Sequence, residues 1–127
     1  MRYFSLALCA FLSLMAFPAE GKDEGLPAEI PAPGQVTMVD LGAKSCIPCK
    51  MMAPILTELE KEYAGRAVIA FIDVRERPEQ AEKYHLRAIP TQIFYERDGR
   101  EQWRHEGFLD KESIVARLKG LGVDGGQ

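Results

Sequence analysis

Hydrophobic and polar positions change their period several times along the chain, and each change marks a predicted element. Residues 36–41 are a short apolar and β-branched run that predicts a strand, followed by a tight glycine-containing loop. From Met52 to Tyr63, apolar residues recur at helical spacing with charged residues between them. This pattern predicts a helix that Pro54 bends and Gly65 ends.

The second half of the chain continues with strand and helix signals. Residues 67–72 are continuously apolar, which predicts a strand that is covered on both faces and central in its sheet. Residues 78–84 predict a short helix that starts at a proline. Residues 91–96 and 101–106 predict two strands joined by an Asp-Gly turn, and Asp110 is the expected cap of a last helix.

The order of these elements predicts an α/β fold class. A βαβ unit is followed by a ββα unit, which implies a mixed central sheet with helices on both faces. The folded domain is expected to span residues 36–123, and the glycine-rich tail 124–127 is expected to be disordered.

Composition and charge narrow this prediction to one small globular domain. The chain has 127 residues, of which 46% are hydrophobic and 28% are charged, as in ordinary globular proteins. The net charge of −3 disfavours nucleic acid as a partner, because binding its backbone requires a concentrated basic face.

The first part of the chain has the pattern of a targeting segment. Seventeen residues from Tyr3 to Ala19 carry no charge and directly follow Arg2, which is typical of a secretory signal. We therefore interpret residues 1–21 as a signal peptide. An uncleaved anchor is the alternative, because seventeen residues lie at the lower edge of the length that spans a bilayer. A lipoprotein signal at Cys9 is disfavoured, because a bulky leucine precedes it and the apolar run continues.

A proline-rich linker is expected between this leader and the domain. Residues 22–35 contain three prolines at short intervals and little apolar material, which predicts an extended segment. Its apolar residues Leu26 and Ile30 can lie against the edge of the domain. The protein is accordingly expected to be periplasmic or otherwise extracytoplasmic, soluble after signal cleavage or tethered to the membrane by its leader.

Two of the three cysteines form a C-x-x-C motif at the start of the first predicted helix. Cys46 and Cys49 alone are compatible with half of a zinc site, a structural disulfide or a redox pair. Further zinc ligands would have to come from His85, His105 or carboxylates, which show no recognisable ligand spacing. A structural disulfide that closes so short a loop contributes little stability.

The redox interpretation has a direct physical basis in the position of the pair. Backbone N–H groups without partners and the positive end of the dipole stabilise a thiolate at a helix N-terminus, so the pKa of Cys46 should fall below the free value of about 8.5. Cys49 follows one turn later, where it can attack a mixed disulfide formed at Cys46. Cys46 is therefore the expected nucleophile and Cys49 the resolving thiol.

Further residues surround this motif in a recognisable order. They are Asp40 six residues before Cys46, Pro54 in the following helix, Ile89-Pro90-Thr91 before the third strand, and Gly107 after the hairpin. Together with the Cys46-Ile47-Pro48-Cys49-Lys50 motif they make residues 36–121 closely resemble the thioredoxin family, and the resemblance implies a thioredoxin-like fold.

The resemblance also implies roles for individual residues. Pro90 would be a cis-proline that faces the cysteines, and Ile89 would offer backbone hydrogen bonds to an extended substrate. Asp40 would be the buried carboxylate that takes the proton from Cys49. Gly107 would lie in a neighbouring loop that lets the substrate chain approach.

The chain also departs from the family pattern. Gly42 and Ser45 stand where cytosolic members carry aromatic residues, so a less aromatic binding groove is expected. Ile69 matches the position of a lysine that often accompanies the buried acid in the family. Because this lysine is absent here, we expect a raised pKa for Asp40. The N-terminal strand and helix of a full-length member are replaced by the proline-rich linker.

The sequence thus favours an exported thiol-disulfide oxidoreductase that reduces disulfides in substrate proteins. We expect it to be a monomer without a cofactor or a metal, recharged by a membrane thiol-electron carrier. One alternative is a disulfide oxidase or isomerase of the same fold, because potentials of such pairs span on the order of 150 mV. The other is a copper or zinc carrier that binds metal through the cysteine pair, an idea that Met51 and Met52 also raise.

Overall fold

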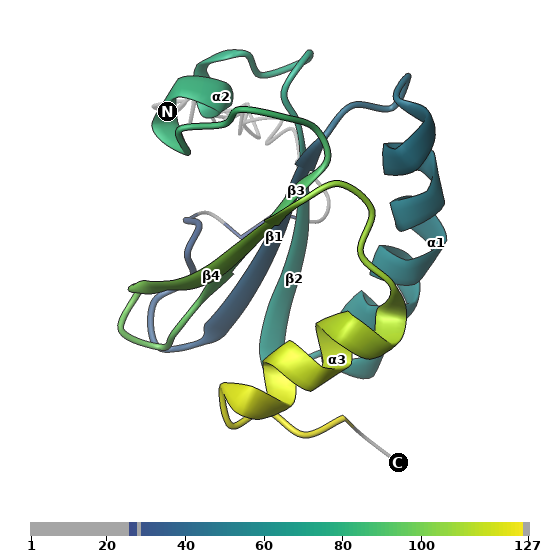
Figure 1. Ribbon diagram of the computed structural model, residues 1–127. Helices are drawn as coiled ribbons and strands as arrows, with labels where there is room; N and C mark the ends of the chain where they lie inside the picture. Colours follow the sequence, from purple (N-terminus) through teal and green to yellow (C-terminus); the bar gives the residue numbers. More distant parts are fainter. Residues whose placement is uncertain (1–25, 28, 126–127) are drawn as a thin grey trace, which may run out of the picture.

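The computed structural model describes residues 26–27 and 29–125 of the chain (Figure 1). The predicted signal peptide, residues 1–21, and the last two residues of the predicted tail lie outside the described residues. Within the described part, no helix combines the length and the apolar character needed to cross a membrane.

A four-stranded mixed sheet forms the centre of the domain, in the order β2-β1-β3-β4. The strands are β1 (Val36–Gly42), β2 (Ala67–Asp73), β3 (Thr91–Tyr95) and β4 (Glu101–Glu106). β1 and β2 run parallel, whereas β1–β3 and β3–β4 are antiparallel pairs. The predicted βαβ unit followed by ββα is therefore confirmed.

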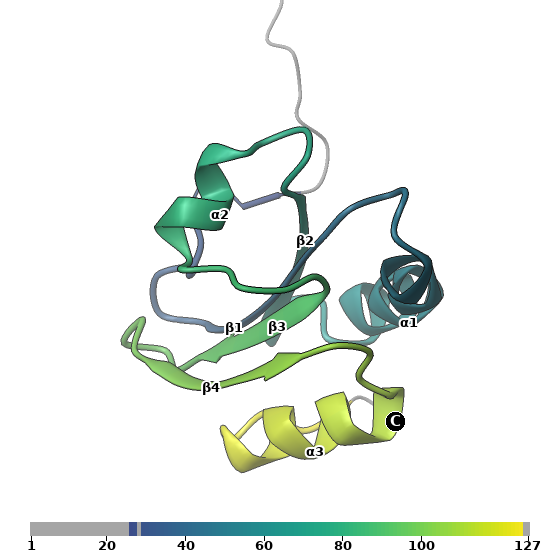
Figure 2. The same cartoon turned by 45° about the horizontal axis from the view of Figure 1, so that its top comes forward.

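Helices cover both faces of this sheet, as Figure 2 shows. α1 (Ile47–Glu62) and α3 (Lys111–Gly120) pack on one face, and the short α2 (Glu79–Lys83) lies on the other side of the sheet. The first face contributes Met38 and Phe94 to a core with apolar residues of α1 and α3. The second face contributes other residues of the same strands, because successive side chains of a strand point to opposite faces.

The prediction that residues 67–72 form a central strand is wrong, because β2 lies at the edge of the described sheet. Its two faces are nevertheless both covered. Ile69 packs in the core that α1 and α3 share, whereas Ile72 packs with Ile30 and Tyr84 on the opposite face. A continuously apolar strand therefore indicates that both of its faces are covered, but it does not indicate whether the strand is central or at the edge of the sheet.

The end of the predicted linker contributes to this second core. Ile30 is buried and Leu26 packs against the same cluster, in agreement with the expectation that they lie against the domain edge. The Tyr84 hydroxyl donates a hydrogen bond of 3.2 Å to the carbonyl of Ile30. The Ala32 N–H donates to Thr37 Oγ1 at 3.0 Å. These contacts fasten the segment to the sheet just before β1 begins.

The predicted turn and cap residues adopt the expected conformations. Gly99 has a φ of 83° at the tip of the β3–β4 hairpin, where a residue with a side chain would be strained. Asp110 caps α3 by accepting a hydrogen bond of 2.8 Å from the Ser113 N–H. The second helix is one residue shorter at each end than the predicted range 78–84.

Candidate active site

The cysteine pair lies at the start of α1, where Cys46 is the N-cap residue. Cys46 and Cys49 form a disulfide with their Cα atoms 5.2 Å apart. Cys46 Sγ also accepts a hydrogen bond of 3.3 Å from the Cys49 N–H. No acidic side chain stands in the first turn of α1, so nothing there opposes the positive end of the helix dipole. A thiolate at Cys46 in the reduced protein would be stabilised by the Cys49 N–H and by the positive end of the helix dipole.

The two cysteines differ in their access to solvent. Cys46 is half-buried, whereas Cys49 is only 3% exposed. Cys49 packs against the end of β1 so closely that a Cβ atom at Gly42 would lie 3.0 Å from Cys49 Sγ. A side chain at position 42 would therefore crowd Cys49 and Phe71, so the glycine allows this close packing.

Asp73, at the end of β2, anchors the loop that precedes the cysteines. Its Oδ2 accepts a hydrogen bond of 2.9 Å from the Lys44 N–H, and its Oδ1 accepts bonds from the N–H groups of Arg75 and Glu76 at 2.8 and 3.2 Å. The Lys44 bond is the largest cause of the lowered pKa of the Asp73 carboxyl. Sequence reasoning missed this residue, although an acid at the end of an apolar run was a usable signal.

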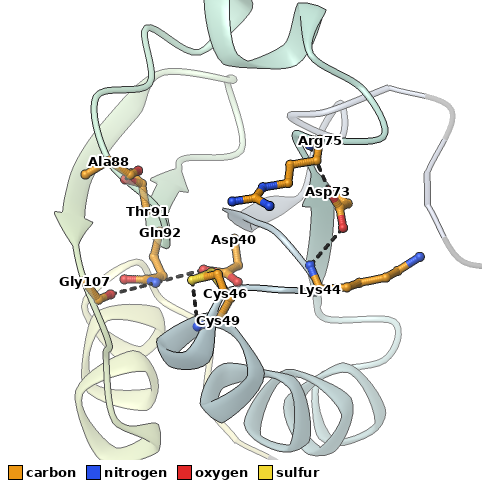
Figure 3. Close-up of a disulfide and its surroundings, with 10 residues drawn as sticks. All are labelled: Asp40, Lys44, Cys46, Cys49, Asp73, Arg75, Ala88, Thr91, Gln92 and Gly107. Carbon is orange, nitrogen blue, oxygen red and sulfur yellow. Dashed lines mark hydrogen bonds between the residues drawn. A yellow bond between two sulfur atoms is a disulfide. The ribbon is translucent and has the colours of Figure 1, made fainter.

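Asp40 is a fully buried acid in the central strand β1. It lies on the same face as Gly42, two residues along the strand, and Figure 3 shows its side chain beside the disulfide. Burial raises the pKa of the Asp40 carboxyl from 3.8 to about 6, and a hydrogen bond from Gln92 opposes this rise. The expected raised pKa is confirmed.

The strand register shows that the residue of β2 beside Asp40 differs from the one expected. Phe71 of β2, and not Ile69, is paired with Asp40, whereas Ile69 is paired with Met38. Counting from the sequence alone misplaced the partner by two residues, because the register depends on how the two strands pair. The consequence is unchanged, since Phe71 is apolar and supplies no cation that would hold Asp40 ionised.

Gln92 is a second buried polar residue of the site, and sequence reasoning missed it. It lies on β3 directly opposite Asp40 and is fully buried. Its Nε2 donates hydrogen bonds to Asp40 Oδ1 at 2.8 Å and to the Gly107 carbonyl at 3.1 Å (Figure 3). An amide directly before the apolar run of residues 93–95 was the available signal, because a buried polar group requires partners.

The Ile89–Pro90 peptide bond is cis, as the resemblance implied. The Pro90 carbonyl accepts a hydrogen bond of 2.8 Å from the Gly107 N–H, which joins the two segments. Within the described part of the chain, neither the N–H nor the carbonyl of Ile89 has a hydrogen-bond partner. Gly107 has a φ of 101°, a conformation that favours glycine.

The other side chains that the sequence raised lie apart from a common site. Met52 is buried in the core and Met51 is 53% exposed, as expected for consecutive helix positions. His85 is exposed, and a ring nitrogen of His105 lies 3.1 Å from the Phe108 carbonyl oxygen. In the described ranges, no group of three or more histidine, cysteine or acidic residues is placed to hold a metal ion.

Comparisons with known proteins agree with this geometry. The sequence model of the thioredoxin family matches residues 20–120. The chain belongs to the thioredoxin family. Thioredoxin from Staphylococcus aureus is 44% identical over 83 residues, which cover 65% of this chain and 79% of that protein.

Solved structures of thioredoxins are similar to the fold as well. A chloroplastic thioredoxin z has a TM-score of 0.63 and 27% identity, covering 70% of this chain and 80% of its own. Thioredoxin from Fasciola hepatica has a TM-score of 0.61 and 32% identity, covering 69% of this chain and 82% of its own. The expected thioredoxin-like fold is confirmed, and a family member with a C-x-x-C disulfide is a thiol-disulfide oxidoreductase.

Proposed function

We propose that this thioredoxin-family protein is an exported reductase of disulfides in substrate proteins. The observation that carries the proposal is the unequal exposure of the two cysteines at the start of α1. A substrate disulfide can reach the half-buried Cys46, whereas Cys49 is enclosed behind it. The order of attack follows from this difference, with Cys46 as the nucleophile and Cys49 as the resolving thiol.

The reaction proceeds in two exchange steps. The Cys46 thiolate attacks one sulfur of the substrate disulfide, forms a mixed disulfide and expels the other substrate sulfur as a thiolate. Cys49 then attacks Cys46, forms the intramolecular disulfide and expels the second substrate thiolate. The cysteine pair loses two electrons and the substrate disulfide gains them. Because Cys46 reacts as a thiolate, one substrate sulfur takes up the proton that Cys49 gives up, and the other takes its proton from solvent.

Asp40 serves the second step as the general base. The Cys49 thiol must lose its proton before it can attack, and Cys49 is shielded from bulk water. With a pKa of about 6, most Asp40 carboxyls are ionised at pH 7 and can accept that proton. An unshifted acid would be a weaker acceptor, because its affinity for the proton would be lower.

The substrate chain binds along the segment that precedes β3. The free N–H and carbonyl of Ile89 can pair with an extended peptide as an added strand would. Pro90 lies beside this segment and is tied to Gly107 through their main chains. Gly107 has open space where a Cβ would stand, which leaves room for a substrate residue next to the disulfide.

Export is supported by the uncharged leader, and it determines where the electrons come from. A reductase outside the cytoplasm is separated from cytoplasmic reductants, so its disulfide has to be reduced by a membrane thiol-electron carrier. The protein would work there as a periplasmic or otherwise extracytoplasmic monomer, soluble after signal cleavage.

The direction of the reaction is tested by the equilibrium potential of the Cys46–Cys49 pair against glutathione, together with insulin reduction. A reductase should have a potential below about −200 mV and reduce insulin, whereas a potential near about −120 mV would identify an oxidant instead. Metal bound stoichiometrically through dialysis, without turnover, would identify a carrier.

The order of attack is tested by replacing one cysteine at a time. Cys46→Ser should abolish turnover, and Cys49→Ser should accumulate mixed disulfides with its substrates, because the resolving thiol is missing. A Cys49→Ser protein that traps nothing would show that the assigned order is wrong. Fractionation of the producing cells, with detection of the protein outside the cytoplasm, tests export separately.

A further inference from the structure

Gln92 is a fully buried amide in the middle of the sheet, and its hydrogen bonds indicate what it does there. It is paired with Asp40 of β1 on one side and with His105 of β4 on the other. Burying an amide costs free energy unless its polar atoms are hydrogen-bonded. The Nε2 atom of Gln92 has such partners, whereas its Oε1 is buried with none among the described residues.

The orientation of this amide is determined by the Gly107 carbonyl. A main-chain carbonyl can only accept hydrogen bonds, so the NH2 end of Gln92 must face it. The same nitrogen donates its other N–H to Asp40 Oδ1 at 2.8 Å. Turning the amide over would lose the bond to Gly107, so Asp40 Oδ1 faces a donor whatever its own protonation state.

The two oxygens of Asp40 are consequently not equivalent. Oδ1 is occupied by the Gln92 amide, whereas Oδ2 is buried and has no hydrogen-bond partner among the described residues. A proton on Oδ1 would point at a hydrogen-bond donor. A proton taken up by this carboxyl is therefore accommodated on Oδ2.

We infer that Gln92 is a positioning residue that keeps Asp40 Oδ1 as a hydrogen-bond acceptor and leaves Oδ2 as the atom that exchanges a proton with Cys49. The inference rests on the proposed role of Asp40 as the general base. The same side chain ties the acid to Gly107, so one amide connects the proton acceptor to the segment proposed to admit the substrate (Figure 3).

Removing this amide should raise the pKa of Asp40 further. A hydrogen bond donated to the charged carboxylate favours the ionised form, and burial then acts unopposed. Around Asp40, β2 contributes the apolar Phe71, β3 contributes Gln92, and α1 contributes Cys49, which does not titrate in the disulfide. His105 lies one strand further away, beside Gln92. The oxidised protein therefore isolates the effect on Asp40.

The test is a carbon NMR titration of carboxyl-labelled aspartate in the oxidised full-length protein. Gln92→Met keeps the length of the side chain and removes both hydrogen bonds, so the Asp40 midpoint should rise by about one pH unit or more. Ile93→Leu is the matched control, because Ile93 is equally buried on the opposite face of β3 and should leave the midpoint unchanged. An unchanged midpoint in Gln92→Met would overturn the inference.

A second measurement needs no substitution and so does not depend on whether the variant folds. In the unmodified protein, one Gln92 side-chain N–H resonance should shift with the Asp40 titration, while the N–H bonded to Gly107 should not. If neither resonance follows Asp40, or both do so equally, Gln92 does not hold the carboxyl in this way.

Asp40→Asn separates this inference from the proposed function. If Asp40→Asn leaves the rate of product release from the mixed disulfide unchanged, Asp40 is not the base, and the inference falls with it. The other outcome is that Asp40→Asn slows product release, while Gln92→Met changes neither the Asp40 midpoint nor the pH at which the release rate falls on acidification. In that case Asp40 is the base and only the role of Gln92 is refuted.

Discussion

Replacing Asp40 by asparagine should stabilise the oxidised protein at neutral pH while it slows catalysis. The carboxyl is fully buried and has a pKa raised from 3.8 to about 6, so the folded protein holds a charge at pH 7 that burial disfavours. Asparagine has nearly the same shape and carries no charge. The acid is then retained for its chemistry at a cost in stability.

The size of this effect follows from the shift of the pKa. Between pH 3.8 and about pH 6 the folded protein binds more protons at Asp40 than the unfolded chain does. Stability contributed by this group is therefore complete below the unfolded pKa and falls as the pH rises to the folded value. A shift of about two units corresponds to at most about 3 kcal/mol, which is the upper limit of the expected gain in Asp40→Asn at pH 7.

The assay is urea denaturation of the oxidised wild type and of Asp40→Asn at pH 4 and pH 7. The variant should be the more stable protein at pH 7, and its advantage should shrink toward pH 4, where Asp40 is largely protonated in the folded protein and most of the burial penalty on its charge is gone. Asp124→Asn is the charge-matched control, because Asp124 is exposed. Equal advantages at the two pH values, or a wild type more stable than the variant at pH 7, would refute the reasoning.

Two further substitutions test the packing and the anchoring of the cysteine loop. Gly42→Ala places a Cβ 3.0 Å from Cys49 Sγ and should lower the free energy of unfolding by about 1–3 kcal/mol. Gly120→Ala is the control, because a Cβ there would meet no atom within 4 Å and should not lower it. Equal urea midpoints for the two variants would contradict this prediction. Asp73→Ala leaves the Lys44 N–H without its acceptor. It should lower the free energy of unfolding by about 1–3 kcal/mol and slow insulin reduction. Unchanged stability and turnover would show that the loop before the cysteines does not depend on Asp73.

The local elements of this protein were predictable because each depends on short stretches of sequence. The Asp-Gly hairpin and the Asp110 cap follow from backbone and side-chain preferences that act within a few residues. The C-x-x-C motif and its place at a helix start are local as well, so the redox pair could be assigned from the sequence. The resemblance to the thioredoxin family added the cis bond at Pro90.

The tertiary structure decided what lies between elements that are distant in the sequence. The edge position of β2 and the pairing of Asp40 with Phe71 depend on strand order and register, which hydrophobic period alone does not specify. The bonds from Gln92 to Asp40 and Gly107 join three segments of the chain.

The sequence by itself therefore determined the elements and the reactive pair, because propensity, capping and the helix dipole act locally. The tertiary structure alone decided how the buried acid is surrounded and held. Long-range pairing sets which side chains share a face, and burial and hydrogen bonding there set the pKa of Asp40.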